Sequence, residues 1–416
     1  MVVRIGDGVT SALNGGECAM VKVWAGVDAG KSHHHCVVID EDGRQLLSRR
    51  VANDEDTLLA LIADVHALEA DAVTWATDLN HGGAALFIEL LSSHDQELLY
   101  IPGQTVHHAA RTYRGDGKTD AKDAGVIADQ ARMRRDLQPL RNGDEISANL
   151  RLLTARRADL VIDRTRAFNR LRATLLEYFP GLETAFDYAN SKSALLLLTR
   201  YQTPDQLRSA GTKRVSAWLS KAGATKGELI AATAVTAAHA QHTIVRSQDI
   251  ASRIVAELAM EILRLHESVA NVDHEIESLL RQHDDGEILL SLPGFGPRLA
   301  AEFLAAIGGG LSGIESADRL AGIAGLAPVP RDSGRISGNH HRPHRYDRRL
   351  LRASFLAAQT AARYCPDSRA YYEKKRSEGK NHKQAVLSLA RRRVNVIWAM
   401  LRDHQPYQTG FQHRPA

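Results

Sequence analysis

The alternation of apolar and polar positions predicts three consecutive β-strands near the start of the chain. Residues 21–28 (VKVWAGVD) alternate and end just before a glycine turn, as a half-buried strand does. Residues 36–40 and 45–51 have the composition of two further strands, and the Glu-Asp-Gly-Arg tetrapeptide at 41–44 supplies the turn between them. We therefore expect a three-stranded meander.

Helix and strand patterns then alternate up to about residue 133. Apolar residues three and four positions apart predict a helix over 54–68, capped by Asn53 or Asp54. The later elements are strands at 72–76 and 98–101 and helices at 83–91 and 120–133. Three meandering strands followed by helix, strand, helix, strand and helix match the α/β ribonuclease H/RuvC-like fold, which we expect for this region.

Long helical patterns dominate the rest of the chain. Apolar residues near a spacing of about 3.5 over 146–179 predict a coiled-coil arm, and a second helix over 244–280 is expected to pack antiparallel on it. The segment LPGFGP at 292–297 opens an all-α C-terminal domain. The expected domains are a leader (1–20), the α/β domain (21–143), the arm (144–284, with an insertion at about 190–240), the C-terminal domain (285–404) and a tail (405–416).

Composition and charge exclude some classes of protein and favour a polyanionic partner. No apolar run in the 416 residues approaches a membrane span, and residues 1–20 lack the pattern of a signal peptide. The three cysteines are far apart and odd in number, which argues against a disulfide scaffold and fits a reducing cytoplasm. Residues 331–402 hold 18 Lys/Arg against 5 Asp/Glu, a local charge of +13 in a chain whose total is only +4.

Four aspartates form the main candidate for catalytic chemistry. Asp28 and Asp78 end two predicted strands, while Asp120 and Asp123 lie three apart on one helix face. Like charges that meet would repel one another without a cation, and Mg²⁺ prefers oxygen ligands, so the group predicts a magnesium site for phosphodiester chemistry. Taken singly, each could be a surface cap or turn residue, and Asp78 could cap the helix that begins near Gly83.

Two other groups of polar residues have simpler interpretations. Asp116 lies in a glycine-rich turn and is interpreted as lying outside the metal site. His33, His34 and His35 lie on a strand, where neighbours point to opposite faces. We therefore expect a solvated or partner-facing triplet rather than a site for a transition metal.

A basic loop of the C-terminal domain holds a candidate nucleophile. Ser333 lies between Arg331 and Arg335; a hydroxyl needs a base, a metal or a cationic frame to attack, and guanidinium groups can bind a phosphate bidentately. On spacing alone a turn serine is the simpler interpretation. Residues 292–308 resemble a helix-hairpin-helix element, whose glycine turn can hold a DNA phosphate, although a plain helix connector fits equally well.

Together these residues resemble the DEDD transposases of bacterial insertion sequences, the bridge-RNA-guided recombinases. The segments that carry the resemblance are VDAGK (27–31), WATDL (75–79), YRGDGKTDAKDA (113–124), LPGFG (292–296), AGLAP (324–328) and DSGR (332–335). The resemblance covers residues 21–180 and 285–402. The departure is Asp78, where the family often has Glu; it is one methylene shorter but keeps the same ligand chemistry.

The resemblance implies a mechanism and partners. Its acidic positions fall on Asp28, Asp78, Asp120 and Asp123, which would hold Mg²⁺, two ions per site, and its nucleophile falls on Ser333, which would form a covalent link to DNA. It also implies donor and target DNA, a structured guide RNA, homodimers that assemble into a tetramer, and a bacterial cytoplasmic, nucleoid-associated location. The candidate nucleic-acid contacts are Lys118, Arg331, Arg335, Arg342, Arg345, Arg391, Arg392 and Arg393.

Two other functions stay open. In a metal-dependent endonuclease of the Holliday-junction type, water would attack the phosphate and Ser333 would be structural. In a non-catalytic nucleic-acid scaffold, the basic region would bind RNA and no covalent adduct with DNA would form.

Overall fold

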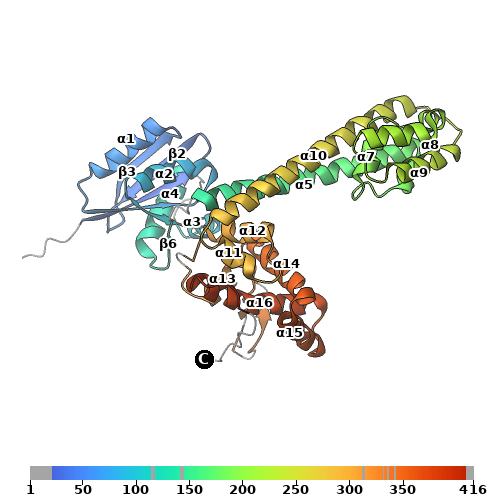
Figure 1. Ribbon diagram of the computed structural model, residues 1–416. Helices are drawn as coiled ribbons and strands as arrows, with labels where there is room; N and C mark the ends of the chain where they lie inside the picture. Colours follow the sequence, from blue (N-terminus) through green and yellow to red (C-terminus); the bar gives the residue numbers. More distant parts are fainter. Residues whose placement is uncertain are drawn as a thin grey trace, which may run out of the picture. The chain divides into compact units, whose positions relative to one another are not determined.

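The protein divides into two compact units, residues 1–142 and 143–416, which are described separately (Figure 1). The computed structural model describes residues 21–113, 117, 119–140, 145–311, 314–330, 332–334, 337–341 and 343–408. The predicted leader lies outside these residues, as does most of the predicted tail.

A mixed six-stranded sheet forms the centre of the first unit. The strands are β1 (Lys22–Ala29), β2 (His33–Ile39), β3 (Gln45–Ala52), β4 (Ala72–Thr77), β5 (Glu97–Tyr100) and β6 (Gln138–Pro139), in the order β3-β2-β1-β4-β5-β6. β2 is antiparallel to β1 and β3, while β4 is parallel to β1 and β5 is parallel to β4. The predicted meander and both later strands are confirmed; the two-residue β6, antiparallel to β5, was not predicted.

Helices cover the two faces of this sheet. The helical elements are α1 (Glu55–His66), the short η1 (Gly82–Ala84), α2 (Ala85–Ser93), α3 (Gly103–Ala110) and α4 (Asp120–Met133). Alternate residues of β1 pack with α1 and α2, and α4 lies on the opposite face. α4 lies directly against β1 because a Cβ atom on Gly26 would be 2.3 Å from the Ala124 carbonyl oxygen. This close approach brings the start of α4 to the end of β1 that carries Asp28.

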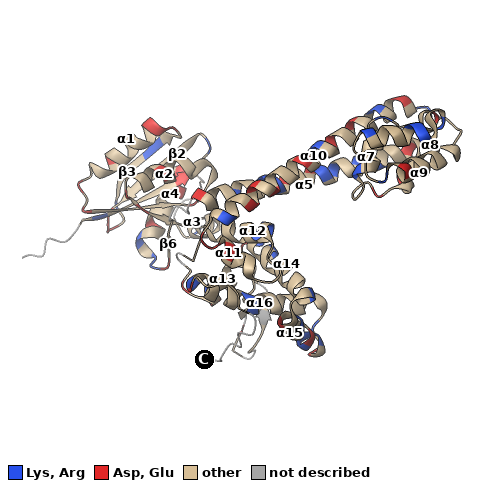
Figure 2. Cartoon of the chain, in the orientation of Figure 1, with Lys and Arg blue, Asp and Glu red and all other residues tan. Residues whose placement is uncertain are grey.

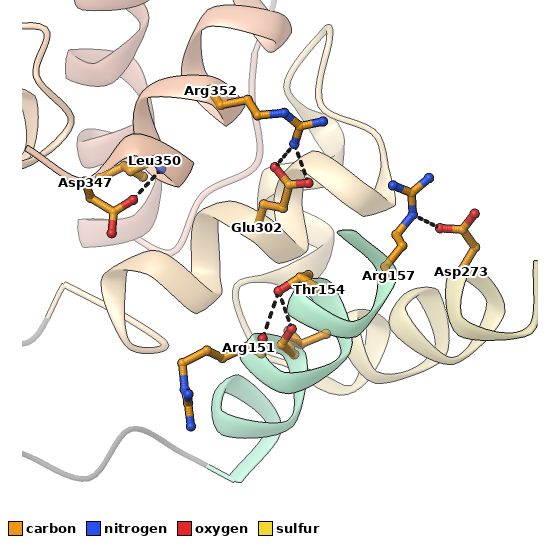
Figure 3. Close-up of polar contacts among 9 residues, drawn as sticks. Arg151, Thr154, Arg157, Asp273, Glu302, Asp347, Leu350 and Arg352 are labelled. Atoms are coloured by element: carbon orange, nitrogen blue, oxygen red, sulfur yellow. Dashed lines mark hydrogen bonds and ion pairs between the residues drawn. The ribbon is translucent and has the colours of Figure 1, made fainter. Parts of the chain in front are cut away.

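Two long antiparallel helices form the arm of the second unit, α5 (Glu145–Tyr178) and α10 (Gln248–Gln282). Arg157 in the first half of α5 binds Asp273 in the second half of α10 (Figure 3). Further along, the Phe168 ring contacts His266. The expected antiparallel pair is therefore confirmed. At its far end, α6 (Pro180–Ala185), α7 (Lys192–Leu198), α8 (Pro204–Lys221) and α9 (Gly227–His239) close a separate hydrophobic core in the region expected to be an insertion.

The C-terminal helices pack around a second core that includes Leu150, Ile276 and Leu280 of the arm. They are α11 (Gly286–Ser291), α12 (Pro297–Ile307), α13 (Ala317–Ile323), α14 (Arg348–Tyr364), α15 (Pro366–Ser377) and α16 (His382–Arg402). Arg352 of α14 binds both carboxylate oxygens of Glu302 on α12 (Figure 3). Among the described residues, no helix is both long and apolar enough to cross a bilayer.

Candidate active site

Asp28 and Asp78 lie at the same edge of the sheet. Asp28 is the penultimate residue of β1 and Asp78 directly follows β4. The two strands are parallel, with Val27 opposite Thr77, so the next residue of each chain segment is one of these aspartates. Parallel strands present their carboxyl ends at one edge, which is where ligands bind in open α/β sheets.

The environment of the Asp78 carboxyl group favours a cation or a proton. Burial raises the pKa of Asp78 above its ordinary value, and the charge of Asp123 raises it further, while the backbone N–H of Ala29 opposes this effect. The Asp78 Oδ1 atom is buried and has no hydrogen-bond partner among the described residues. Burial also raises the pKa of the Tyr100 hydroxyl, and the Asp78 charge adds to that rise.

The first turn of α4 brings the other two aspartates to this edge. Thr119 caps the helix, its hydroxyl accepting from the Lys122 N–H at 3.1 Å, so Asp120 and Asp123 are free to project from the first turn rather than serve as caps. The charge of Asp120 acts on His35, which lies opposite Asp28 in the β1–β2 ladder; it raises the pKa of His35 against the larger lowering by burial. Asp123 therefore lies within electrostatic range of Asp78. Asp120 lies within electrostatic range of His35, the residue opposite Asp28.

This arrangement fits a magnesium ion by its chemistry. The candidate donors are all carboxylates, the Asp78 Oδ1 atom lacks a hydrogen-bond partner among the described residues, and the charge of Asp123 adds to the rise in the Asp78 pKa that burial causes. A hard cation prefers such oxygen ligands and would offset the repulsion between their charges. Within the described part of the chain, however, no three His, Cys, Asp or Glu side chains stand close enough together to enclose a metal ion. The alternative role of Asp78 as a cap is wrong, because His81 and Ala84 occupy the N-cap positions of η1 and α2.

Ser333 lies in the tip of a small β-hairpin in the second unit. The hairpin pairs β7 (Val329–Pro330) with β8 (His340–His341). Asp332 closes the tip by accepting a hydrogen bond from the Asn339 N–H at 2.9 Å, and the adjacent Ser333 is exposed. An exposed hydroxyl on a short hairpin is accessible to a large substrate. The neighbouring Arg331, Arg335 and Arg342 lie outside the described residues, as do Lys118 and Asp116.

Lys and Arg residues recur along α15 and α16 (Figure 2), and Arg392 is exposed whereas Tyr371 and Lys375 are half-buried. The guanidinium of Arg392 lies 4.8 Å from the centre of the Tyr371 ring, and the Lys375 ammonium lies 5.4 Å from the same ring. The ring contact can hold the Arg392 side chain in place without neutralising it, whereas Lys375 also forms an ion pair with Glu378 at 2.7 Å. Arg391 is half-buried and paired with Asp318, while Arg345 is exposed.

Arg393 lies in the core rather than on the exposed face expected for it. Its guanidinium donates to the Pro293 carbonyl oxygen and, at 3.2 Å, to the Ser368 hydroxyl, and burial lowers its pKa to about 10. Three consecutive helical residues spread over about 200° of the helix circumference, so the three arginines cannot share one narrow face, and on α16 the third points into the core. A group enclosed in this way is not available to a phosphate backbone.

The glycine turn before α12 packs closely on α14. Gly294 has a φ of 91°, and a Cβ atom there would be 2.2 Å from the Ala357 carbonyl oxygen. Packing therefore explains this glycine, and binding of a DNA phosphate by the turn stays a prediction.

Two polar residues near the acidic edge were not recognised as part of the site. His34 is only 1% exposed, so the expectation of a solvated histidine triplet is wrong for it. Asn53 was expected only as a possible cap of α1, a role that Asp54 fills. The sequence does indicate that His34 is buried: alternate residues of a strand point to the same face, and His34 alternates with the buried Cys36 and Val38.

Comparison with known proteins identifies the family. Residues 25–180 match the DEDD transposase model of IS110, and residues 286–373 match the model described as "Transposase IS116/IS110/IS902 family". A solved structure of T. thermophilus RuvC in complex with a Holliday junction substrate is similar at 15% identity, covering 28% of this chain and 99% of that one. Its TM-score is 0.22, too low to carry an argument.

Curated relatives match over nearly their full length. The "Insertion element IS900 uncharacterized 42 kDa protein" of Mycobacterium paratuberculosis is 61% identical, and the match covers 92% of this chain and 97% of that protein. The "Insertion element IS116 uncharacterized 44.8 kDa protein" of Streptomyces clavuligerus is 50% identical, with 92% and 95% covered. The "Mini-circle putative transposase for IS117" of Streptomyces coelicolor is 27% identical, with 92% and 95% covered. The chain therefore belongs to the IS116/IS110/IS902 family of transposases.

Proposed function

We propose that this transposase excises and inserts its element through a covalent link between Ser333 and DNA, assisted by the acidic group at the edge of the sheet. The observation that carries the proposal is the position of Asp28 and Asp78 at the carboxyl ends of the paired parallel strands β1 and β4, where the buried Asp78 Oδ1 atom has no hydrogen-bond partner among the described residues. Carboxylates brought together in this way need a cation, and phosphoryl transfer is the chemistry that a cation in such a site serves.

The strand order supports a ribonuclease H/RuvC-like fold for the first unit. An antiparallel meander, followed by parallel β4 and β5 on the other side of β1, gives the order expected from the sequence. We propose that Asp28, Asp78, Asp120 and Asp123 hold Mg²⁺, two ions per site. When bound, the ions would supply positive charge beside the phosphate that is transferred.

The proposed step conserves the number of phosphodiester bonds. The Ser333 hydroxyl oxygen attacks the phosphorus, forming a serine–phosphate ester as the bond to one strand's sugar oxygen breaks. The hydroxyl proton is lost to solvent, and the leaving sugar oxygen takes up a proton. In the second half, a strand hydroxyl attacks the ester and restores the serine, so strands are exchanged without net hydrolysis. An exposed Ser333 on a hairpin tip is consistent with attack on an extended duplex.

We also propose that a structured RNA encoded by the element guides the protein to donor and target DNA. The supports are the family resemblance and the local charge of residues 331–402, where 18 Lys/Arg face 5 Asp/Glu. Homodimers that assemble into a tetramer, a coiled-coil arm formed by α5 and α10, and a nucleoid-associated location belong to the same proposal. Sequencing the RNA that co-purifies with the protein tests the guide: one discrete species supports it, and random fragments contradict it.

The test of the serine mechanism is a covalent adduct. Ser333→Ala is expected to abolish both strand joining and the protein–DNA adduct seen on a denaturing gel with labelled DNA, because the attacking oxygen is gone. The matched control is Ser337→Ala, an exposed serine in the same hairpin, which should form the adduct as the wild type does. Wild-type joining by Ser333→Ala would show that water or another group attacks.

A further inference from the structure

Two loops flank the edge of the sheet that carries Asp28 and Asp78. One is the turn from β1 to β2 at residues 30–32, and the other is the segment at 78–83 between β4 and α2. They are in direct contact: a Cβ atom on Gly83 would lie 2.8 Å from the Gly30 carbonyl oxygen. The position of either loop therefore depends on the other.

One side-chain amide ties these loops together. The Asn53 Nδ2 group donates to the Lys31 carbonyl oxygen at 3.1 Å and to the Gly83 carbonyl oxygen at 2.9 Å. The Asn53 backbone N–H also donates to the Ser32 carbonyl oxygen at 2.9 Å. Asn53 thus uses its donors on both loops while lying between β3 and α1, outside the acidic group itself.

A buried histidine supports the same turn from beneath. The His34 Nδ1 atom accepts a hydrogen bond from the Gly30 N–H at 3.2 Å, so in the neutral ring Nε2 carries the proton. The Asn53 amide raises the pKa of His34 against the larger lowering by burial, which places the two side chains together. His34 Nε2 is then a donor and Asn53 Oδ1 an acceptor. Neither atom has another hydrogen-bond partner among the described residues, so each is the natural partner of the other.

These contacts lead directly to the acidic group. Gly30, which His34 holds, follows Ala29, whose backbone N–H lowers the pKa of Asp78. Movement of the turn would therefore displace the group that orients the Asp78 carboxylate. We infer that Asn53 and His34 are positioning residues that set the spacing of Asp28 and Asp78 for a divalent cation, an inference that rests on the proposed magnesium site.

The test replaces hydrogen bonds without changing charge. Asn53→Leu keeps the approximate shape of the side chain but loses both donors, and Mg²⁺ binding to the full-length protein is measured by isothermal titration calorimetry. We expect affinity about 10-fold weaker than that of the wild type, as for other residues that orient metal ligands. The matched control is Gln96→Met: Gln96 also donates to a backbone carbonyl, that of His94 at 2.9 Å, but at the amino end of β5, away from the acidic edge. It should bind Mg²⁺ as the wild type does.

A second variant covers loss of folding. If circular dichroism shows that Asn53→Leu is unfolded, Gly83→Ala is used; it removes no polar group but forces Gly83 away from Gly30, and the same weakening is expected. His34→Asn, which can keep an acceptor for the Gly30 N–H, should bind Mg²⁺ better than His34→Ala.

Two results would overturn the inference in distinguishable ways. Wild-type Mg²⁺ affinity in folded Asn53→Leu or Gly83→Ala would leave the metal site standing and remove the positioning role. If the Asp123→Asn variant bound Mg²⁺ as tightly as the wild type, the proposed metal site itself would be ruled out, and the positioning role with it.

Discussion

At the scale of single residues, Arg392 and Arg393 show how neighbours on one helix take different roles. Arg392 is exposed over Tyr371, whereas Arg393 is buried and holds the Pro293 carbonyl oxygen. The rotation of α16 within its core is decided by buried apolar residues that include Leu389, Val394 and Ile397. A charge pattern alone does not reveal which arginine such packing turns inward.

Replacing each arginine with lysine tests this difference. Arg393→Lys keeps the charge buried but loses the planar fork that reaches two acceptors, so we expect the free energy of unfolding to fall by about 1–3 kcal/mol. Arg392→Lys should change it by less than about 0.5 kcal/mol, because the residue is exposed. Urea unfolding of both variants measures the effect, and equal stability of the two would contradict the burial of Arg393.

His34 predicts a dependence of stability on pH. Burial lowers its pKa below the ordinary 6.5, so the unfolded chain binds a proton that the folded chain does not. The free energy of unfolding should therefore fall as the pH drops through about 6.5 toward the folded-state pKa. Measurements between about pH 5 and 8 on the wild type and His34→Gln should show a shallower fall in the variant; identical slopes would mean that His34 is protonated equally in both states.

At the scale of elements, the spacing of apolar residues predicted the helices and strands that bury one apolar face, and it missed those that do not. β1, α1 and α4 bury regular stripes and were predicted to within about two residues. α3 was missed because Val106 is its only fully buried residue, leaving no stripe to detect. β6 has two residues and exists only through pairing with β5, which no local pattern encodes.

The arm contains an ionic contact that connects three helices. Asp273 of α10 binds Arg157 of α5 and, at 2.7 Å, Arg298 of α12, with only 17% of the Asp273 side chain exposed. Asp273→Asn should lower the free energy of unfolding by about 2 kcal/mol, because two guanidinium groups lose their charged acceptor.

The control for Asp273 lies one turn further along α10. Glu277→Gln breaks an exposed pair with Arg281 and should cost about 0.5 kcal/mol or less. Denaturant unfolding followed by circular dichroism measures both variants, and a larger loss for Glu277→Gln would contradict the connecting role of Asp273.

At the scale of the whole molecule, the proposed catalytic residues are divided between two units. Asp28, Asp78, Asp120 and Asp123 belong to the first, and Ser333 belongs to the second. Strand order made the placement of Asp28 and Asp78 at one edge predictable, because the ends of parallel strands meet there; their role with Asp120 and Asp123 in holding a metal stays a prediction. Ser333 is marked in the sequence by its two flanking arginines and by the family resemblance, since a hairpin of two-residue strands leaves no periodic pattern. The contacts of the buried His34 and the half-buried Asn53 could not be predicted without knowing which loops touch.

The charge distribution predicts how the molecule binds nucleic acid. If Arg392 contacts a phosphate, Arg392→Ala should weaken binding to unrelated DNA sequences about equally and reduce the slope of log K against log salt by about 0.9. Arg44→Ala is the control, since the Arg44 side chain is 79% exposed in a turn of the other unit and lies 3.8 Å from the Asp42 carboxylate; it should leave the slope unchanged. Binding of labelled duplexes across a salt series measures both. A loss confined to one sequence, at constant slope, would mean instead that Arg392 contacts bases, and the surface of α15 and α16 would then select targets rather than hold the backbone.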